Sequence, residues 1–344
     1  MQAPYPQKRY TYANQKGGVT KTTKAANYGI AATMCGKRVL AVDVDHGQGN
    51  LTYALGYTQW KLKHTVYTVM TGDSTSDQAI LPTYYDPQTG IFFDPQDSQQ
   101  MSELGLSSLE QAVRGPDLLP MNPDLCNGAD FELIQRGDWG QLLRQVLGDL
   151  QGHYDEMHLD TNPDIKSVFP KSAVYAATDV VIPTTPENWS IQGLIMLAQF
   201  LMQARAVNEH FNIAGVFFAR IRYSAHREMM RIAREEVIPS INQMIEEAQK
   251  EAQRQHKSRL VRQLQGLQFH CFENIDSESK EHSNQTLSRS TVMTAKKTKK
   301  GELAPALEQW NCYIELLQTT GGSGIEQAML HYNALIDQYD QARN

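Results

Sequence analysis

The residues best suited to chemistry form one short run near the start of the chain, KGGVTKTT at residues 16–23. Its two glycines leave backbone N–H groups open to phosphate oxygens, and a helix starting just after them adds its positive end. A lysine and a threonine at this spacing hold the β- and γ-phosphates and Mg²⁺, respectively. We therefore predict a bound nucleoside triphosphate with Mg²⁺, contacted by Lys16, Gly17, Gly18, Val19, Thr20, Lys21, Thr22 and Thr23.

Three aspartates can extend this site. Asp43 and Asp45 lie at the carboxyl end of an apolar run, the edge at which open α/β sheets bind ligands. Residues two apart on a strand share a face, so one acid can activate water while the other supports the metal. Asp160 closes a second apolar run, EMHLD. With Thr22 and Asp43, Asp160 is predicted to hold the metal; solvated strand-end acids are the alternative.

The elements that position these residues are predicted from the surrounding pattern. Residues 9–14 resemble a short strand, residues 21–35 a helix closed by Gly36, and residues 38–44 a buried strand rich in β-branched side chains. Strand, loop, helix and strand in this order make a βαβ unit, whose strands are parallel.

The rest of the chain continues the alternation. Strands are expected at 117–119, 156–160, 179–183, 213–218 and, as a candidate last strand, 269–272. Helices are expected at 51–81 (helical and polar by turns), 139–151, 190–206, 223–265 (nearly continuous), 303–317 and 324–342. Residues 82–100 are rich in turn formers and predict a hairpin or surface excursion, within an expected insertion at 82–115. Residues 277–300 are polar and predicted to be irregular. We expect a single α/β domain over 1–344: a doubly wound, mostly parallel sheet of the P-loop NTPase type, with a helical C-terminal part at 223–344.

Composition limits the function classes. The chain has 344 residues, of which 41% are hydrophobic, so it can bury a full core. Its formal net charge of −6 excludes binding to nucleic acid through overall charge. Four cysteines without a CxxC pair favour neither a disulfide framework nor a zinc site. No apolar run approaches the about 20 residues that span a bilayer, and no signal peptide is seen, so a cytoplasmic location is expected.

With these motifs established, the chain resembles the deviant Walker A ATPases of the ParA/MinD family, specifically the ParA (Soj) branch. The loop at 14–23 resembles the Walker A box, and GKRVLAVDVD at 36–45 the A-prime box. Further segments follow in the family's order: 65–83, LLPMNPDL at 118–125, the Walker B-like HYDEMHLDTNPD at 153–164, and VVIPTTPENWSIQGL at 180–194. The resemblance covers about residues 9–220.

The resemblance implies specific roles. Lys16 would be the signature lysine that reaches the partner's nucleotide, so ATP would join two subunits into a homodimer. Lys21 would act on the phosphates, and Asp45 would position the attacking water. Members of the family are slow ATPases whose ATP-bound dimer binds DNA without sequence preference, and a ParB-like adaptor on the cargo stimulates hydrolysis. Because the loop lies so near residue 1, no operator-binding helix-turn-helix is expected before it.

Two departures from the family pattern bear on turnover. Thr20 stands where the family has glycine, so a β-branched residue narrows the loop's conformational freedom. The segment from Asp45 to Gly49 reads DHGQG where the family usually has DPQG, which adds one residue after the acid. Both departures bear on the rate of hydrolysis more than on binding.

DNA contacts in this family come from basic residues late in the chain. Candidates are Arg220, Arg222, Arg227 and Arg231; Arg254, Lys257, Arg259 and Arg262; and Lys296, Lys297, Lys299 and Lys300. Ordinary solvated faces are an equally weighted alternative. The last helix lacks the flanking bases of a membrane-binding helix, so no membrane role is expected. The segment Asn162–Asp164 lacks the lysine of a guanine motif, which favours ATP over GTP.

Two functions follow from the sequence. The first is a weak ATPase, nucleoid-associated in the cytoplasm, that segregates a plasmid, chromosome or similar cargo through DNA and an adaptor. The second is an ATP-dependent scaffold or positioning protein with little turnover, acting in conjugation or on a cargo other than DNA.

Overall fold

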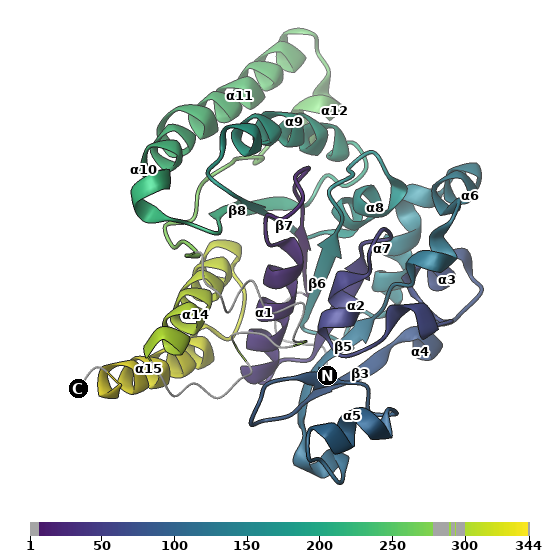
Figure 1. Ribbon diagram of the computed structural model, residues 1–344. Coiled ribbons are helices and arrows are strands. Elements are labelled where there is room, and N and C mark those ends of the chain that lie inside the picture. The colour runs from purple at the N-terminus through teal and green to yellow at the C-terminus, as the bar shows by residue number, and fades with distance from the viewer. Residues whose placement is uncertain (1–6, 278–288, 290–292, 294–299, 343–344) are drawn as a thin grey trace.

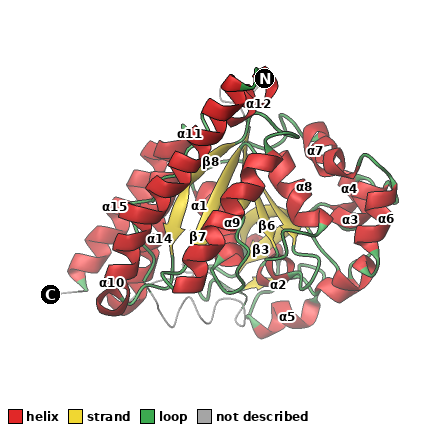
Figure 2. Cartoon of the chain, turned by 90° about the horizontal axis from the view of Figure 1, so that it is seen from above, coloured by secondary structure: helices red, strands yellow, loops and turns green. Residues whose placement is uncertain are grey.

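An eight-stranded sheet lies between two layers of helices (Figures 1 and 2). The computed structural model describes residues 7–277, 289, 293 and 300–342. Along the sheet the strands run in the order β4-β3-β5-β2-β6-β1-β7-β8. Six are mutually parallel: β1 (Lys8–Tyr12), β2 (Val39–Val44), β5 (Val113–Leu119), β6 (Glu156–Thr161), β7 (Asp179–Thr184) and β8 (Asn212–Phe218). The predicted doubly wound, mostly parallel α/β fold is confirmed.

The βαβ unit is formed as predicted. The helix α1 (Lys21–Met34) follows β1 and leads to β2, and Gly36 ends the turn after it with φ +79°. The strand β6 pairs with both β1 and β2, opposing Tyr12 and Asp43 to Asp160. This register brings the carboxyl ends of the three strands together at one edge.

Residues 82–115 form one side of the sheet. The strand β3 (Leu81–Tyr85) pairs antiparallel with β5 and with β4 (Phe92–Phe93), which confirms the hairpin. The helix α5 (Ser98–Glu103) and a short 3₁₀ turn at Leu109–Gln111 lie between β4 and β5. The predicted strand at 117–119 therefore begins earlier, at Val113.

Helices cover both faces of the sheet because side chains alternate along each strand. On β2, Val39 and Ala41 face α1, α14 (Lys300–Thr320) and α15 (Ile325–Gln341), whereas Leu40 and Val42 face the opposite layer. That second layer consists of α3 (Val66–Thr71), α4 (Ser76–Ala79), α6 (Ala129–Gln135), α7 (Trp139–Asp149), α8 (Val168–Ala176), α9 (Asn188–Ala204), α11 (Ile238–Arg254) and α12 (Ser258–Leu264).

Three predictions about elements need correction. Residues 51–81 contain only short helices, α2 (Asn50–Ala54), α3 and α4, because turns at Gly56 and Gly72 interrupt them. Residues 223–265 are divided into α10 (Tyr223–Ile232), a π-helical turn at 233–237, α11 and α12. The segment 269–272 makes only an isolated bridge, from Cys271 to Val216, and is no strand. Most of 277–300 lies outside the described residues.

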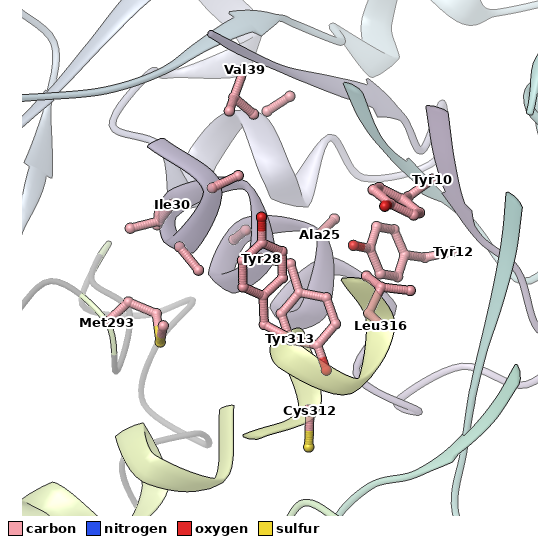
Figure 3. Packing of buried hydrophobic residues seen from close by; sticks show 14 of the residues in the cluster. Tyr10, Tyr12, Ala25, Tyr28, Ile30, Val39, Met293, Cys312, Tyr313 and Leu316 are labelled. Atoms are coloured by element: carbon pink, nitrogen blue, oxygen red, sulfur yellow. The ribbon is translucent and has the colours of Figure 1, made fainter. Parts of the chain in front are cut away.

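The helix α14 is tied to α1 through a buried charge and through aromatic packing; Figure 3 shows the aromatic packing. The rings of Tyr28 and Tyr313 lie 5.7 Å apart, and Lys24 is fully buried between the helices. Its ammonium forms an ion pair with Asp276 at 3.1 Å and donates a hydrogen bond to Gln309 at 2.7 Å. A buried charge is tolerated only when it is paired in this way.

Within the described part of the chain, none of the helices combines the length and apolar character needed to cross a bilayer.

Candidate functional site

The loop between β1 and α1 is fixed to the sheet at its start. The Asn14 side chain donates a hydrogen bond to the carbonyl of Pro183 (2.7 Å) and accepts one from the N–H of Lys16 (3.0 Å). The backbone N–H of Ala13 also bonds to β7, at Val181 (3.0 Å). These hydrogen bonds fix the direction in which the loop leaves the sheet, at the carboxyl ends of the parallel strands.

A cavity of about 710 Å³ opens beside this loop. Its wall contains every predicted phosphate-loop residue from Gly17 to Thr23, together with Asp45. No atom lies within 4 Å of where a Cβ of Gly17 would stand, so any side chain there would enter the cavity. The remaining lining residues are Gly47, Gln48, Asn50, Thr161, Asn162, Pro163, Asp164 and Arg220.

The side chain of Lys21 reaches back across the phosphate loop to its first residue, Lys16. This side chain is almost wholly buried, and its ammonium donates to the Lys16 carbonyl at 3.1 Å. Burial lowers the pKa of Lys21, while the nearby Asp160 and Asp45 oppose this shift. A cation held in this way can bind the oxygens of a phosphate chain.

Among the three acids, Asp160 has the fewest hydrogen bonds. It is fully buried, and no donor makes a well-formed hydrogen bond to either of its carboxylate oxygens, although the Thr22 hydroxyl lies close enough to stabilise its charged form. Burial and the charges of Asp43 and Asp45 raise its pKa well above the usual range, and the nearby Thr22 hydroxyl and Lys21 counter this only partly. An unpartnered carboxylate beside a threonine hydroxyl fits Mg²⁺, which prefers oxygen ligands.

Magnesium would find few protein ligands here. Among the described residues, no group of three or more His, Cys, Asp or Glu side chains has metal-binding geometry. This suits Mg²⁺, which keeps several waters and binds through one or two side chains and the phosphates of its substrate. Thr22 and Asp160 fit that role.

Asp43 lies behind the cavity wall and is fully buried. One carboxylate oxygen accepts hydrogen bonds from the N–H (2.8 Å) and hydroxyl (2.7 Å) of Thr52, and the other from the N–H of Asp45 (3.1 Å). Burial and the charge of Asp45 raise its pKa to about 7. These bonds favour support of the Asp45 loop over direct metal binding, and its predicted metal role stays a prediction.

Asp45 faces the cavity from the end of β2. Its carboxylate accepts a hydrogen bond from the N–H of Gly47 at 3.1 Å, and its carbonyl accepts from Gly49 at 2.9 Å. Burial raises its pKa, against the effect of these bonds and of Lys21. The geometry lets Asp45 orient a water molecule at the cavity wall, and this role remains a prediction.

Lys16 does not line the cavity in this arrangement. Its ammonium forms an ion pair with the exposed Glu187 and lies 3.4 Å from the Thr185 hydroxyl. The pKa of Glu187 is lowered, first by its hydrogen bond from Lys16 and further by the charges of Arg220 and His226. A Lys16 side chain that reaches another subunit must first leave Glu187.

Thr20 adopts a backbone conformation that suits glycine. Its φ is +69° and its ψ +21°, in the left-handed region, and its hydroxyl oxygen is buried without a hydrogen-bond partner. That conformation costs an L-residue about 1–2 kcal/mol, and β-branched residues rarely adopt it. The loop therefore keeps the glycine-type geometry despite its threonine.

Arg220 lies on the cavity wall, although the sequence suggested it only as a DNA contact. It follows β8 with a φ of +56°, and its guanidinium donates to the carbonyl of Gly18 at 3.4 Å. The side chain thus lies beside the phosphate loop at the cavity. Sequence reasoning missed this because no spacing pattern links residue 220 to the loop.

The loop after β6 also contributes residues that the sequence did not assign. Asn162 and Asp164 line the cavity together with Asp45. Their place within the DTNPD segment, directly after Asp160, was a signal that could have identified them.

Comparison with known proteins gives a consistent picture. The family model described as an AAA domain (AAA_31) matches residues 7–214. The chromosome-partitioning ATPase Soj of Treponema pallidum is 28% identical over 212 residues, 61% of this chain and 70% of that protein. Cobyrinic acid a,c-diamide synthase of Mycobacterium smegmatis, solved with an ATP analog and magnesium, is 29% identical, with a TM-score of 0.53 over 65% of this chain and 78% of that one.

A more distant structure covers nearly the whole chain. McdA of Cyanothece in complex with ATP is 17% identical, with a TM-score of 0.61 over 92% of this chain and 96% of that one, which supports the fold. Matches to curated relatives are shorter, spanning 58% to 70% of the lengths of the first relatives.

The strain at Thr20 predicts an order of stability. The free energy of unfolding of Thr20→Gly should exceed that of Thr20→Ala by about 1 kcal/mol, so Thr20→Gly should unfold at higher urea concentration. The reason is that only glycine adopts the left-handed conformation without strain. Both variants lack the hydroxyl, so the difference isolates the effect of Cβ. Equal stabilities in urea denaturation would contradict the strained geometry.

The raised pKa of Asp160 predicts that replacing this carboxyl group stabilises the folded protein by an amount that depends on pH. The folded protein keeps this proton where the unfolded chain has released it, so wild-type stability falls as pH rises through that range. Without Mg²⁺, Asp160→Asn should therefore stabilise the protein more at about pH 8 than at about pH 5, as measured by urea denaturation. An equal gain at both pH values would count against the buried, proton-holding acid.

Proposed function

The chain belongs to the AAA domain family, as a P-loop ATPase of the ParA/MinD type, and on that premise we propose that it is a weak partition ATPase. In this proposal ATP with Mg²⁺ joins two copies into a dimer, and the dimer binds DNA without sequence preference. An adaptor of the ParB type, carried by a plasmid, chromosome or similar cargo, then stimulates hydrolysis.

The observation that carries the proposal is that the buried Lys21 and the buried Asp160, whose charges interact, lie at one open phosphate loop. Lys21 supplies positive charge to the phosphates, and Asp160 with Thr22 supplies oxygen ligands for Mg²⁺. The metal would neutralise charge that develops on the phosphate oxygens during hydrolysis. The solved relative with an ATP analog and magnesium supports the same ligand pair.

Slow turnover has a physical basis in two residues. The carboxylate of Asp45 is already engaged by the N–H of Gly47, so orienting a water molecule competes with this hydrogen bond. Thr20 holds a strained backbone at the phosphate loop, and its buried hydroxyl lacks a partner. Both features oppose the small adjustments that hydrolysis requires.

Dimer formation would depend on Lys16. Its ion pair with Glu187 holds the ammonium outside its own cavity, at an exposed surface that a second copy can approach. A bound triphosphate of the partner would compete with Glu187 for this ammonium, because a polyphosphate carries more negative charge than one carboxylate. ATP would thereby promote dimerisation.

The described basic residues differ in how free they are to bind DNA. On α10, Arg231 is engaged by three carboxylates, those of Glu228, Glu235 and Glu236. At the α11–α12 corner, Lys257 and Arg259 border a surface hollow, and Arg254 and Arg262 are exposed beside them. Arg254 and Arg259 each face a single carboxylate, Glu251 at 3.6 Å and Glu209 at 3.9 Å, and not three as Arg231 does. Of the third candidate cluster, Lys296, Lys297 and Lys299 lie outside the described residues, as does the side chain of Lys300. We therefore assign DNA contact first to the α11–α12 corner.

The alternative is an ATP-dependent scaffold or positioning protein with little turnover. The strain at Thr20 is the observation that favours it, because it bears on hydrolysis more than on binding. Measuring ATP turnover with and without duplex DNA separates the two, since a scaffold would bind ATP without any stimulated release of phosphate.

The Lys16–Glu187 pair predicts opposite effects of two substitutions on dimerisation. Lys16→Ala should abolish the ATP-dependent dimer, because the cation for the partner's nucleotide is lost. Glu187→Gln should preserve the dimer and allow it at lower ATP concentration, because it releases Lys16. Light scattering over an ATP titration measures both, and an unchanged dimer in Lys16→Ala would overturn the cross-subunit role.

The α11–α12 corner predicts a salt-dependent loss of DNA affinity. Lys257→Gln with Arg262→Gln should weaken binding of the ATP form to duplex DNA and lower the slope of log affinity against log salt by about two. Arg231→Gln is the matched control, because its charge is already engaged by carboxylates. Equal losses in variant and control would place the DNA contact elsewhere.

A further inference from the structure

His46 connects the two loops that carry acids into the cavity. It follows Asp45 directly, in the segment after β2. Its ring stacks on Phe169 at the start of α8, with centroids 4.8 Å apart and an interplanar angle of 16°. Its Nδ1 lies 2.8 Å from the side-chain nitrogen of Asn162, in the loop after β6. A single half-buried side chain in the loop after β2 thus contacts both α8 and the loop after β6.

The direction of the hydrogen bond follows from the neighbouring bonds. The side-chain oxygen of Asn162 accepts from the N–H of Asp164 at 3.0 Å, so its amide nitrogen must face His46. An amide nitrogen only donates, and therefore Nδ1 of His46 accepts. The histidine proton then resides on Nε2, a tautomer assigned from this network.

The link gives the two loops one relative arrangement. On the β2 side, the N–H of His46 bonds to the Val44 carbonyl (3.1 Å), and the next residue, Gly47, donates to Asp45. On the β6 side, Asn162 and Asp164 line the same cavity as Asp45. A displacement of one loop must move the other or break the bond to His46.

We propose that His46 is a positioning residue for ATP hydrolysis, holding the Asp45 loop and the Asn162–Asp164 loop in register across the bound triphosphate. The proposal rests on the ATPase function above. Hydrolysis is sensitive to this arrangement because misplacing a catalytic group by about 1 Å can reduce a rate about a hundredfold. Affinity is less sensitive, since the phosphate loop and Lys21 bind the nucleotide independently of this link.

A packing role alone would require only the ring. Phe169 is fully buried, and any aromatic side chain can stack on it. The acceptor at Nδ1 is what a packing aromatic lacks. The two properties are separable: His46→Phe keeps a ring and loses the acceptor, whereas His46→Asn loses the ring and places an oxygen acceptor close to the position of Nδ1.

The experiment compares steady-state ATP hydrolysis of the full chain and these two variants. His46→Phe should lower kcat about tenfold or more and leave KM within about threefold, whereas His46→Asn should keep kcat within about threefold of wild type. An unchanged kcat in His46→Phe, or equal losses of kcat in both variants, would overturn the proposal. A loss confined to KM would also overturn it.

A spectroscopic measurement tests the link without turnover. In ¹⁵N-histidine-labelled protein, the resonances lost in His46→Asn identify His46, and its shifts should show a proton on Nε2 and an unprotonated Nδ1. Asn162→Ala should shift the Nδ1 resonance toward that of an imidazole nitrogen without a donor, because the hydrogen bond to it is lost. If wild type hydrolyses no ATP, the proposed function fails while this measurement still decides the link; a proton on Nδ1 would refute it.

Discussion

The structure depends on the burial of three carboxylates at one edge of a parallel sheet. Asp43, Asp45 and Asp160 meet there because β2 and β6 are neighbours in register. The positive charge of Lys21 interacts with Asp45 and Asp160. Like charges taken out of water raise one another's pKa, and a single buried lysine offsets this only in part. The uncompensated negative charge favours the binding of a cation that completes the site, and it destabilises the protein without one.

The fold tolerates this arrangement because the surrounding sheet is covered on both faces. Side chains of β2 alternate between two hydrophobic layers, so the strand ends are fixed by packing and not by the charges themselves. Hydrogen bonds then give each acid a different environment. Asp43 is held by Thr52, Asp45 by Gly47, and Asp160 has no such partner. Differences of this kind allow equivalent carboxylates to perform separate tasks.

Local spacing predicted much of the site, and long-range contacts account for the rest. The glycines, Lys21 and Thr22 are close in sequence, so their shared geometry follows from a strand–loop–helix unit. Asp160 was recognisable because it ends an apolar strand. By contrast, Arg220 turns toward Gly18 through a left-handed backbone angle that no spacing pattern encodes. The contact of His46 with Asn162 joins loops whose proximity is set by the order of strands. The segment 269–272 was apolar enough to predict a strand, yet it pairs at one residue only.

The buried ion pair between Lys24 and Asp276 has a consequence for how the chain is made. Lys24 lies one turn beyond the phosphate loop, but its partners Asp276 and Gln309 are synthesised some 250 residues later. Until they leave the ribosome, the first helix carries a lysine that cannot be buried without cost. Burial of this face of the first helix therefore depends on a segment beyond the family-matched residues 7–214.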